Sequence, residues 1–135
     1  MITYKQLHHV SLSVTDIEKS KAFYKNILCL KELNRPDFDF QGAWFEVGEQ
    51  QIHLIVFPES KMRNGIVEIN TKEAHFALRV DNYFETLEWL HQHNVKIKEN
   101  KYSKSGFAQI FCCDPDGNII ELNVEQKDLE QTEGE

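Results

Sequence analysis

The strongest constraint on the fold of this chain is an internal repeat. The octapeptide HVSLSVTD at 9–16 aligns with HFALRVDN at 75–82, with histidine, leucine and valine at the same offsets. The segments IHLIV and IELNV also correspond, so that His53 and Glu121 occupy matching positions. Two copies are too few to bury the core of a stacked solenoid. The repeat therefore predicts two similar modules packed side by side.

Hydrophobic periodicity predicts a strand, a helix and three further strands in each half. The expected strands are 7–14, 42–48, 51–58, 74–80, 95–97, 107–113 and 118–124, and the expected helices are 15–30 and 81–95. The prediction is a single α+β domain over 1–127, with one module at about 5–58 and the other at about 73–124. Residues 59–72 are expected to connect them. The acidic tail 125–135 is expected to be disordered.

Composition narrows the partners that the chain can have. The 135 residues carry a net charge of −7, and no basic cluster is long enough to follow phosphates, which argues against a nucleic acid or an anionic membrane. No apolar run approaches the roughly 18 residues that span a bilayer. The N-terminal segment lacks a secretory pattern, and three cysteines suit a reducing compartment. We expect a cytoplasmic protein with a small-molecule substrate.

Strand alternation places four side chains that can bind a metal on the faces opposite the apolar residues. In each of these strands the apolar neighbours mark the face that the helix covers. If the two sheets curve toward one another, the four side chains meet in one site. They are His9, His53, His75 and Glu121.

The same alternation separates other candidates from this set. His8 has the opposite parity and is expected to face the helix, whereas His91 and His93 are expected to lie in solvent on the second helix. Four further residues share the parity of the metal-binding candidates and are expected to contact a substrate. They are Ser11, Trp44, Phe111 and Asn123.

These features resemble the vicinal oxygen chelate superfamily, which includes glyoxalase I, methylmalonyl-CoA epimerase, fosfomycin-resistance thiol transferases, extradiol dioxygenases and bleomycin-binding proteins. The resemblance covers 5–124 and rests on HVSLSVTDIEKSKAFYKNIL, HFALRV and above all DPDGNIIEL. It implies paired βαβββ modules that form a cupped, incompletely closed barrel, and a homodimer. By position, the four candidates match the places from which the family draws its metal ligands. The DPDG motif also suits a tight turn, so Asp114 and Asp116 are expected to form that turn.

Three imidazoles and one carboxylate suit one divalent ion per site: Zn, Ni, Co, Mn or Fe. Such an ion would bind a substrate through two neighbouring oxygens. By analogy with glyoxalase-like relatives, Glu121 is expected to act as the base. The expected function is a metal-dependent lyase or isomerase acting on a small carbonyl or thioester-linked substrate. The alternatives are a non-catalytic small-molecule binding or resistance protein and a metal-dependent dioxygenase.

Departures from individual families refine this expectation. Glyoxalase I generally has a carboxylate where His53 stands, and the epimerase has an amide there. Fosfomycin thiol transferases carry a tyrosine ten residues before the last ligand and an arginine shortly after it. Here these regions hold Phe111 and the acidic EQKDLEQ, which disfavours that activity. Extradiol dioxygenases commonly use two histidines and one carboxylate, so a fourth ligand counts against them.

Overall fold

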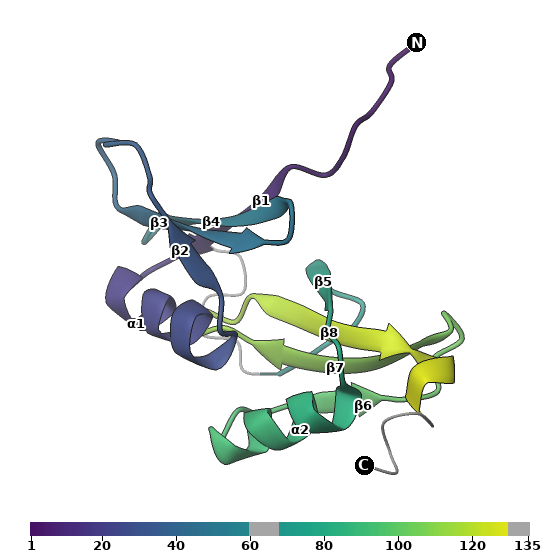
Figure 1. Cartoon of the computed structure of the whole chain (residues 1–135). Helices are drawn as coiled ribbons and strands as arrows, with labels where there is room; N and C mark the ends of the chain where they lie inside the picture. Colours follow the sequence, from purple (N-terminus) through teal and green to yellow (C-terminus); the bar gives the residue numbers. More distant parts are fainter. Residues whose placement is uncertain (60–67, 130–135) are drawn as a thin grey trace. The chain divides into compact units, whose positions relative to one another are not determined.

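The computed structural model describes residues 1–59 and 68–129 and divides the chain into two compact units, Met1–Asn64 and Gly65–Glu135. Each unit contains a strand, a helix and three more strands in that order (Figure 1). Each of the two sheets has four strands in an open order, so neither closes on itself. The predicted α+β class with two βαβββ modules is confirmed.

The first unit is built on a mixed sheet with the order β1-β4-β3-β2. Its strand β1 runs parallel to β4, and the other neighbouring strands are antiparallel. The helix begins after Asp16, whose side chain accepts hydrogen bonds from the backbone N–H groups of Glu18 and Lys19. The elements are β1 (His9–Val14), α1 (Ile17–Ala22) with the π-helical turn η1 (Phe23–Ile27), β2 (Lys31–Leu33), β3 (Gly42–Val47) and β4 (Gln50–Val56).

The second unit repeats this topology with the order β5-β8-β7-β6, and β5 runs parallel to β8. Its helix is capped by the Asn82 side chain and is followed by Asn94 at φ 56°, a left-handed position that suits asparagine. Within the described residues, no helix has the length and apolar character that crossing a membrane requires. The elements are β5 (His75–Arg79), α2 (Tyr83–Gln92), β6 (Lys98–Asn100), β7 (Phe107–Cys113), β8 (Ile119–Glu125) and the 3-10 turn η2 (Gln126–Asp128).

The positions of two short edge strands were not predicted correctly from the sequence. The third strand of the first half was expected but not located, and it lies at Lys31–Leu33. The strand expected at 95–97 instead lies at Lys98–Asn100, where all three side chains are exposed. Both strands have three residues at the edge of a sheet, so they show no alternation from which a strand can be recognised.

The predicted disordered tail begins too early. Glu125 closes β8, and the following 3-10 turn leads to Leu129, which is buried. The turn is fastened by Gln126, whose side-chain amide donates to the carbonyl oxygens of Ser103 and Phe107 at 2.7 and 3.1 Å. Because this contact is polar, the hydrophobic pattern of the sequence does not predict it. The remaining tail, 130–135, and the connector residues 60–67 lie outside the described residues.

The apolar face of each sheet forms the core of its unit. In the first unit α1 contacts β3 and β4, and the Tyr24 ring lies 5.7 Å from the Phe45 ring across that face. In the second unit the helix contributes the buried side chains of Tyr83 and Leu90. Most buried apolar strand residues have the predicted core-facing parity: Ala43, Phe45, Ile52 and Leu54 in the first unit, and Ala108, Ile110, Cys112, Ile120, Leu122 and Val124 in the second. Phe111 and Ile119 are also buried, but they lie on the opposite face of their sheet.

The DPDG turn between β7 and β8 is organised by the Asp114 carboxylate. One of its oxygens accepts from the backbone N–H groups of Asp116 and Asn118, both at 2.9 Å, and the other accepts from the Asn118 side chain at 2.8 Å. Gly117 adopts φ 86°, a left-handed conformation that favours glycine. Asp114 and Asp116 are therefore turn formers, as predicted.

We expect Asp114→Ala to lower the free energy of unfolding by about 3 kcal/mol, because it leaves one buried and one half-buried backbone N–H group without their charged acceptor. Urea denaturation measures the loss. Asp37→Ala, in an exposed loop, is the matched control and should change stability by less than about 0.5 kcal/mol. Equal effects of the two substitutions would contradict this role for Asp114.

Candidate functional site

Parallel pairing of β1 with β4 brings the two predicted ligands of the first unit together. His9 is paired with Gln51, so His53 lies two positions further along β4 and on the same face. The rings of His9 and His53 stack at 4.0 Å with an interplanar angle of 15°. Trp44, the cross-strand neighbour of His53 on β3, stacks on it at 4.2 Å and 7°. His53 therefore lies between two rings, one from each flanking strand.

The environment of His53 favours its neutral form. Burial lowers the pKa of this imidazole, and the neighbouring charges of His9, His8 and Arg35 lower it further. Neutral imidazole is the form that binds a metal. Its Nε2–H donates to the Gln51 side-chain oxygen at 2.7 Å. A metal would therefore bind through Nδ1, or through Nε2 after the Gln51 amide has turned away.

The second unit uses the same register for its own pair. His75 is paired with Ile119, so Glu121 lies two positions further along β8, as His53 does in the first unit. The His75 Nε2 lies 3.3 Å from the Glu121 Oε1. The His75 Nδ1–H donates to the Glu73 carbonyl oxygen at 2.8 Å, so that Nε2 is the ring nitrogen that faces the carboxylate. A divalent cation bound at this place would contact both atoms.

A polar chain holds the Glu121 carboxylate in place. The Asn123 side-chain N–H donates to Glu121 Oε2 at 2.6 Å, and the Asn123 side-chain oxygen accepts from the Arg79 Nε–H at 2.7 Å. Arg79 also donates to Glu125 at 3.3 Å, and its guanidinium lies 5.1 Å from the centre of the Phe107 ring. Asn123 is 4% exposed and is engaged at both ends of its amide. It therefore supports Glu121 directly.

Arg79 is the site residue that sequence reasoning missed. It lies on β5 four positions after His75, and hence on the same face of the strand. The strand parity that indicates His75 also indicates Arg79. Its link to Asn123 became visible only with the register, which pairs these two residues across β5 and β8.

Of the other residues predicted to contact a substrate, Ser11 is exposed and Phe111 is buried. Ser11 is exposed on β1 opposite His53, and Phe111 lies beside Glu121 as its cross-strand neighbour. Phe111 is buried with Ile69 and Ile119 in a small apolar cluster. The ring of His75 meets Phe111 edge-on at 5.4 Å. Phe111 therefore forms an apolar wall next to the His75–Glu121 pair.

The prediction that His8 faces the helix is wrong. Strand β1 begins at His9, so the alternation does not extend to residue 8, and His8 is exposed. Its Nδ1 lies 2.8 Å from the Nδ1 of His9, which makes it a neighbour of the first pair. His91 and His93 are exposed on and after α2, as predicted.

The donor chemistry of both pairs fits a divalent metal, although each pair supplies only two donors. Within residues 1–59 and 68–129, no group of three or more His, Cys, Asp or Glu side chains is arranged to hold a metal ion. Imidazole and carboxylate donors suit Zn and the later divalent ions of the first transition row. The fixed tautomer of His75 is the arrangement that a metal-binding histidine requires.

The family model of the Glyoxalase/Bleomycin resistance protein/Dioxygenase superfamily matches residues 6–122. The chain belongs to this superfamily. It is 30% identical to a lactoylglutathione lyase of Salmonella typhimurium over 91% of this chain and 94% of that protein. It is also 30% identical to the metallothiol transferase FosB of Staphylococcus saprophyticus, over 89% of this chain and 77% of that protein.

One solved structure with a similar fold contains a metal ion. A variant of the fosfomycin resistance protein FosX from Listeria monocytogenes was solved with Mn(II) and 1S,2S-dihydroxypropylphosphonic acid. The two structures superpose with a TM-score of 0.73, covering 93% of this chain and 98% of that chain, at 21% sequence identity. At this sequence identity the likeness shows a common fold.

We expect Asn123→Leu to lower the free energy of unfolding by about 2–3 kcal/mol, because it removes the partner of a buried carboxylate while keeping the side-chain volume. Urea denaturation at neutral pH measures the loss of unfolding free energy. The control is Gln109→Leu on the neighbouring strand, paired with Asn123 and half-buried, which should cost less than about 1 kcal/mol. A loss no larger than that of the control would show that Asn123 does not support Glu121.

Proposed function

We propose that this protein is a divalent-metal-dependent lyase or isomerase of glyoxalase type, acting on a small carbonyl or thioester-linked substrate through two neighbouring oxygens. The observation that carries the proposal is the His75–Glu121 pair, whose donor atoms face each other at 3.3 Å. His9 and His53 have the matching register in the first unit, which supports a metal-binding role for this pair as well. The four side chains together would bind one ion of Zn, Ni, Co, Mn or Fe.

The roles of the individual residues follow from their surroundings. A bound divalent ion would supply Lewis acidity toward the two substrate oxygens. Glu121 removes the proton from the carbon next to the carbonyl and returns it to the carbonyl carbon, while the hydroxyl proton passes from one of the two substrate oxygens to the other, so the reaction needs no oxidant or reductant. Asn123 orients the carboxylate through its 2.6 Å hydrogen bond to Oε2, which leaves Oε1 on the side of His75. The proposed chemistry therefore places Oε1 as the reacting oxygen.

Aromatic side chains next to each pair would exclude water and contact the substrate. Trp44 lies against His53 in the first unit, and Phe111 lies against His75 in the second. Exclusion of water strengthens the electrostatic interactions on which proton abstraction depends. Ser11, exposed beside His53, would offer a hydroxyl to the substrate.

Thiol transfer to fosfomycin is not proposed, although FosB is among the relatives. Phe111 is the cross-strand neighbour of Glu121, so the residue ten positions before the acid lies directly beside it. In this chain that position carries no hydroxyl group. We further propose that the protein acts in the cytoplasm as a homodimer, with the four ligands drawn from one chain or from two.

We expect purified protein to bind about one divalent ion per chain, and His75→Ala to weaken that binding by at least about 10- to 100-fold. Elemental analysis and competition with a chelator measure both quantities. His91→Ala is the matched control, because it removes an exposed histidine from α2. Metal binding by the His75→Ala protein that equals that of the control would rule out His75 as a ligand.

We expect the protein to isomerise a hemithioacetal of a 2-oxoaldehyde, and EDTA to abolish this activity. Glu121→Gln should lower kcat by about 10²- to 10⁴-fold, because the amide cannot accept the proton. Glu49→Gln, in the exposed turn between β3 and β4, should leave kcat unchanged. Substrate disappearance is followed spectrophotometrically under several divalent metals.

Two outcomes would replace the proposed function by one of its alternatives. Tight binding of a small molecule without turnover, unchanged in the His75→Ala protein, would identify a binding or resistance protein. Oxygen consumption dependent on Fe(II) would identify a dioxygenase. Turnover that withstands EDTA would contradict the dependence on a metal.

A further inference from the structure

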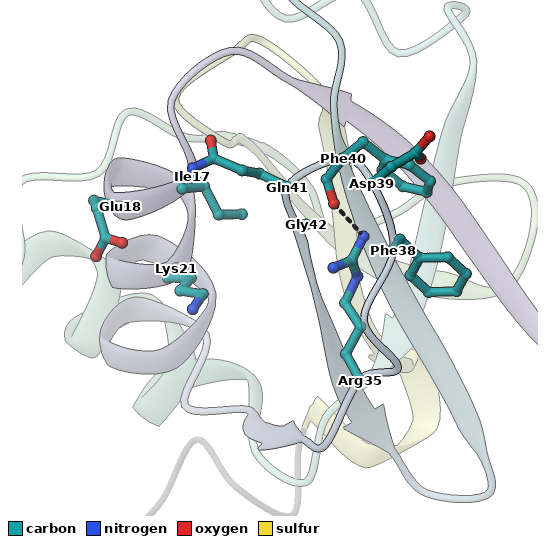
Figure 2. Close-up of a pocket in the computed structure, with 9 residues that line it drawn as sticks. All are labelled: Ile17, Glu18, Lys21, Arg35, Phe38, Asp39, Phe40, Gln41 and Gly42. Carbon is teal, nitrogen blue, oxygen red and sulfur yellow. Dashed lines mark hydrogen bonds between the residues drawn. The ribbon is translucent and has the colours of Figure 1, made fainter.

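An open groove of about 440 Å³ lies in the first unit between α1 and the loop 34–41 (Figure 2). We call it the α1–loop groove. Lys21 on α1 and Arg35 on the loop form opposite walls, and Figure 2 shows their charged ends bordering the gap. The carboxylates of Glu18 and Asp39 point away from it. The groove therefore presents positive charge to an occupant.

Arg35 is held in place before any ligand arrives. Its Nη2–H donates to the Phe40 carbonyl oxygen at 2.9 Å, and its Cζ lies 4.6 and 5.0 Å from the centres of the Phe38 and Phe40 rings. A Cβ at Gly42 would come within 3.0 Å of Arg35 Nη2 and would collide with the Leu54 carbonyl oxygen. Glycine at position 42 thus leaves room for the guanidinium. A guanidinium stacked on rings keeps its planar edge for a bidentate oxyanion.

The charge on the α1 wall is only partly compensated. The Glu32 carboxylate lies 3.3 Å from the Lys21 Nζ and 3.6 Å from the Lys25 Nζ. One carboxylate thus serves two ammonium groups, so it only partly neutralises the charge of Lys21, which lines the groove opposite Arg35. Charges of one sign on both sides of a groove attract a ligand of the opposite sign.

Aromatic rings connect the α1–loop groove with the first ligand pair. The Phe38 ring lies 6.2 Å from the Trp44 ring, and Trp44 stacks on His53 at 4.2 Å. Phe38 and Phe40 are 45% and 40% exposed, so their faces are accessible to a ligand. A molecule anchored at Arg35 can therefore lay an apolar frame along these rings toward His53.

We propose that the α1–loop groove binds the oxyanion end, carboxylate or phosphate, of the substrate, whose apolar frame lies on Phe38 and Trp44. The substrate class is accordingly a small carbonyl or thioester-linked compound that carries an acidic group. The identification of the ligand as the substrate rests on the proposed function, whereas the binding of an oxyanion in the groove does not.

The test uses EDTA-treated, ¹⁵N-labelled full-length protein titrated with 3-phenylpropanoate, phenyl phosphate and the neutral 3-phenylpropanamide. We expect one or both anions to shift the backbone N–H signals of loop 34–41 and α1. The affinity for the neutral 3-phenylpropanamide should be at least about tenfold lower. Arg35→Gln should weaken anion binding at least about tenfold. The anion affinity of Arg35→Lys should lie between those of the wild-type and Arg35→Gln proteins, because lysine keeps the charge but cannot donate two parallel hydrogen bonds. The tighter anion identifies the acidic group.

Two further variants separate binding in the groove from general charge effects. Lys19→Gln removes a positive charge from an exposed part of the same helix and should change anion affinity less than twofold. Lys21→Gln tests the opposite wall independently if Arg35→Gln fails to fold. Equal binding of acid and amide, equal effects of Arg35→Gln and Lys19→Gln, or shifts outside the groove would each overturn the proposal.

A kinetic measurement connects the groove with catalysis. For an acidic substrate, Arg35→Gln should raise KM with kcat unchanged, and for a neutral substrate it should change neither. Anion binding that depends on Arg35, without metal-dependent turnover, would refute the proposed function but support oxyanion binding in the groove. Metal-dependent turnover without anion binding that depends on Arg35 would refute only oxyanion binding in the groove.

Discussion

The parallel pairing of the first and last strand of each module is the constraint on which the candidate site depends. It joins β1 to β4 and β5 to β8, and in both units the second ligand candidate lies two positions beyond the partner of the first. A slip of one residue would turn His53 or Glu121 to the opposite face of its sheet. The core prevents this slip, because it would also expose Ile52, Leu54, Ile120 and Leu122.

The two modules share this register but stabilise their polar residues in different ways. In the first unit His53 is buried among rings and has an amide partner, which suits an uncharged imidazole. In the second unit Glu121 is buried with a hydrogen bond from Asn123 and with the His75 ring beside it, because a buried carboxylate requires polar partners. The duplicated fold thus supplies one pair of two imidazoles and one pair of an imidazole and a carboxyl group. The proposed four-ligand metal site would draw on both.

Much of the fold was predictable from local patterns. Asp16 and Asn94 mark helix ends through their own side-chain and backbone preferences, and Asp114 marks the turn before β8. The strands β2 and β6 were not predictable, because three residues at an edge carry no periodic signal. The ordered segment after Glu125 was missed because a polar contact of Gln126 fastens it.

The sequence by itself determined which side chains share a face, because alternation along a strand depends only on the backbone. It therefore placed His9, His53, His75 and Glu121 opposite the core of their own sheets. Only the tertiary structure decided what each of them touches. Gln51 and Asn123 follow from side-chain packing, and Arg35 reaches its groove through a loop without periodicity. Such contacts depend on distances between chain segments, which no local pattern encodes.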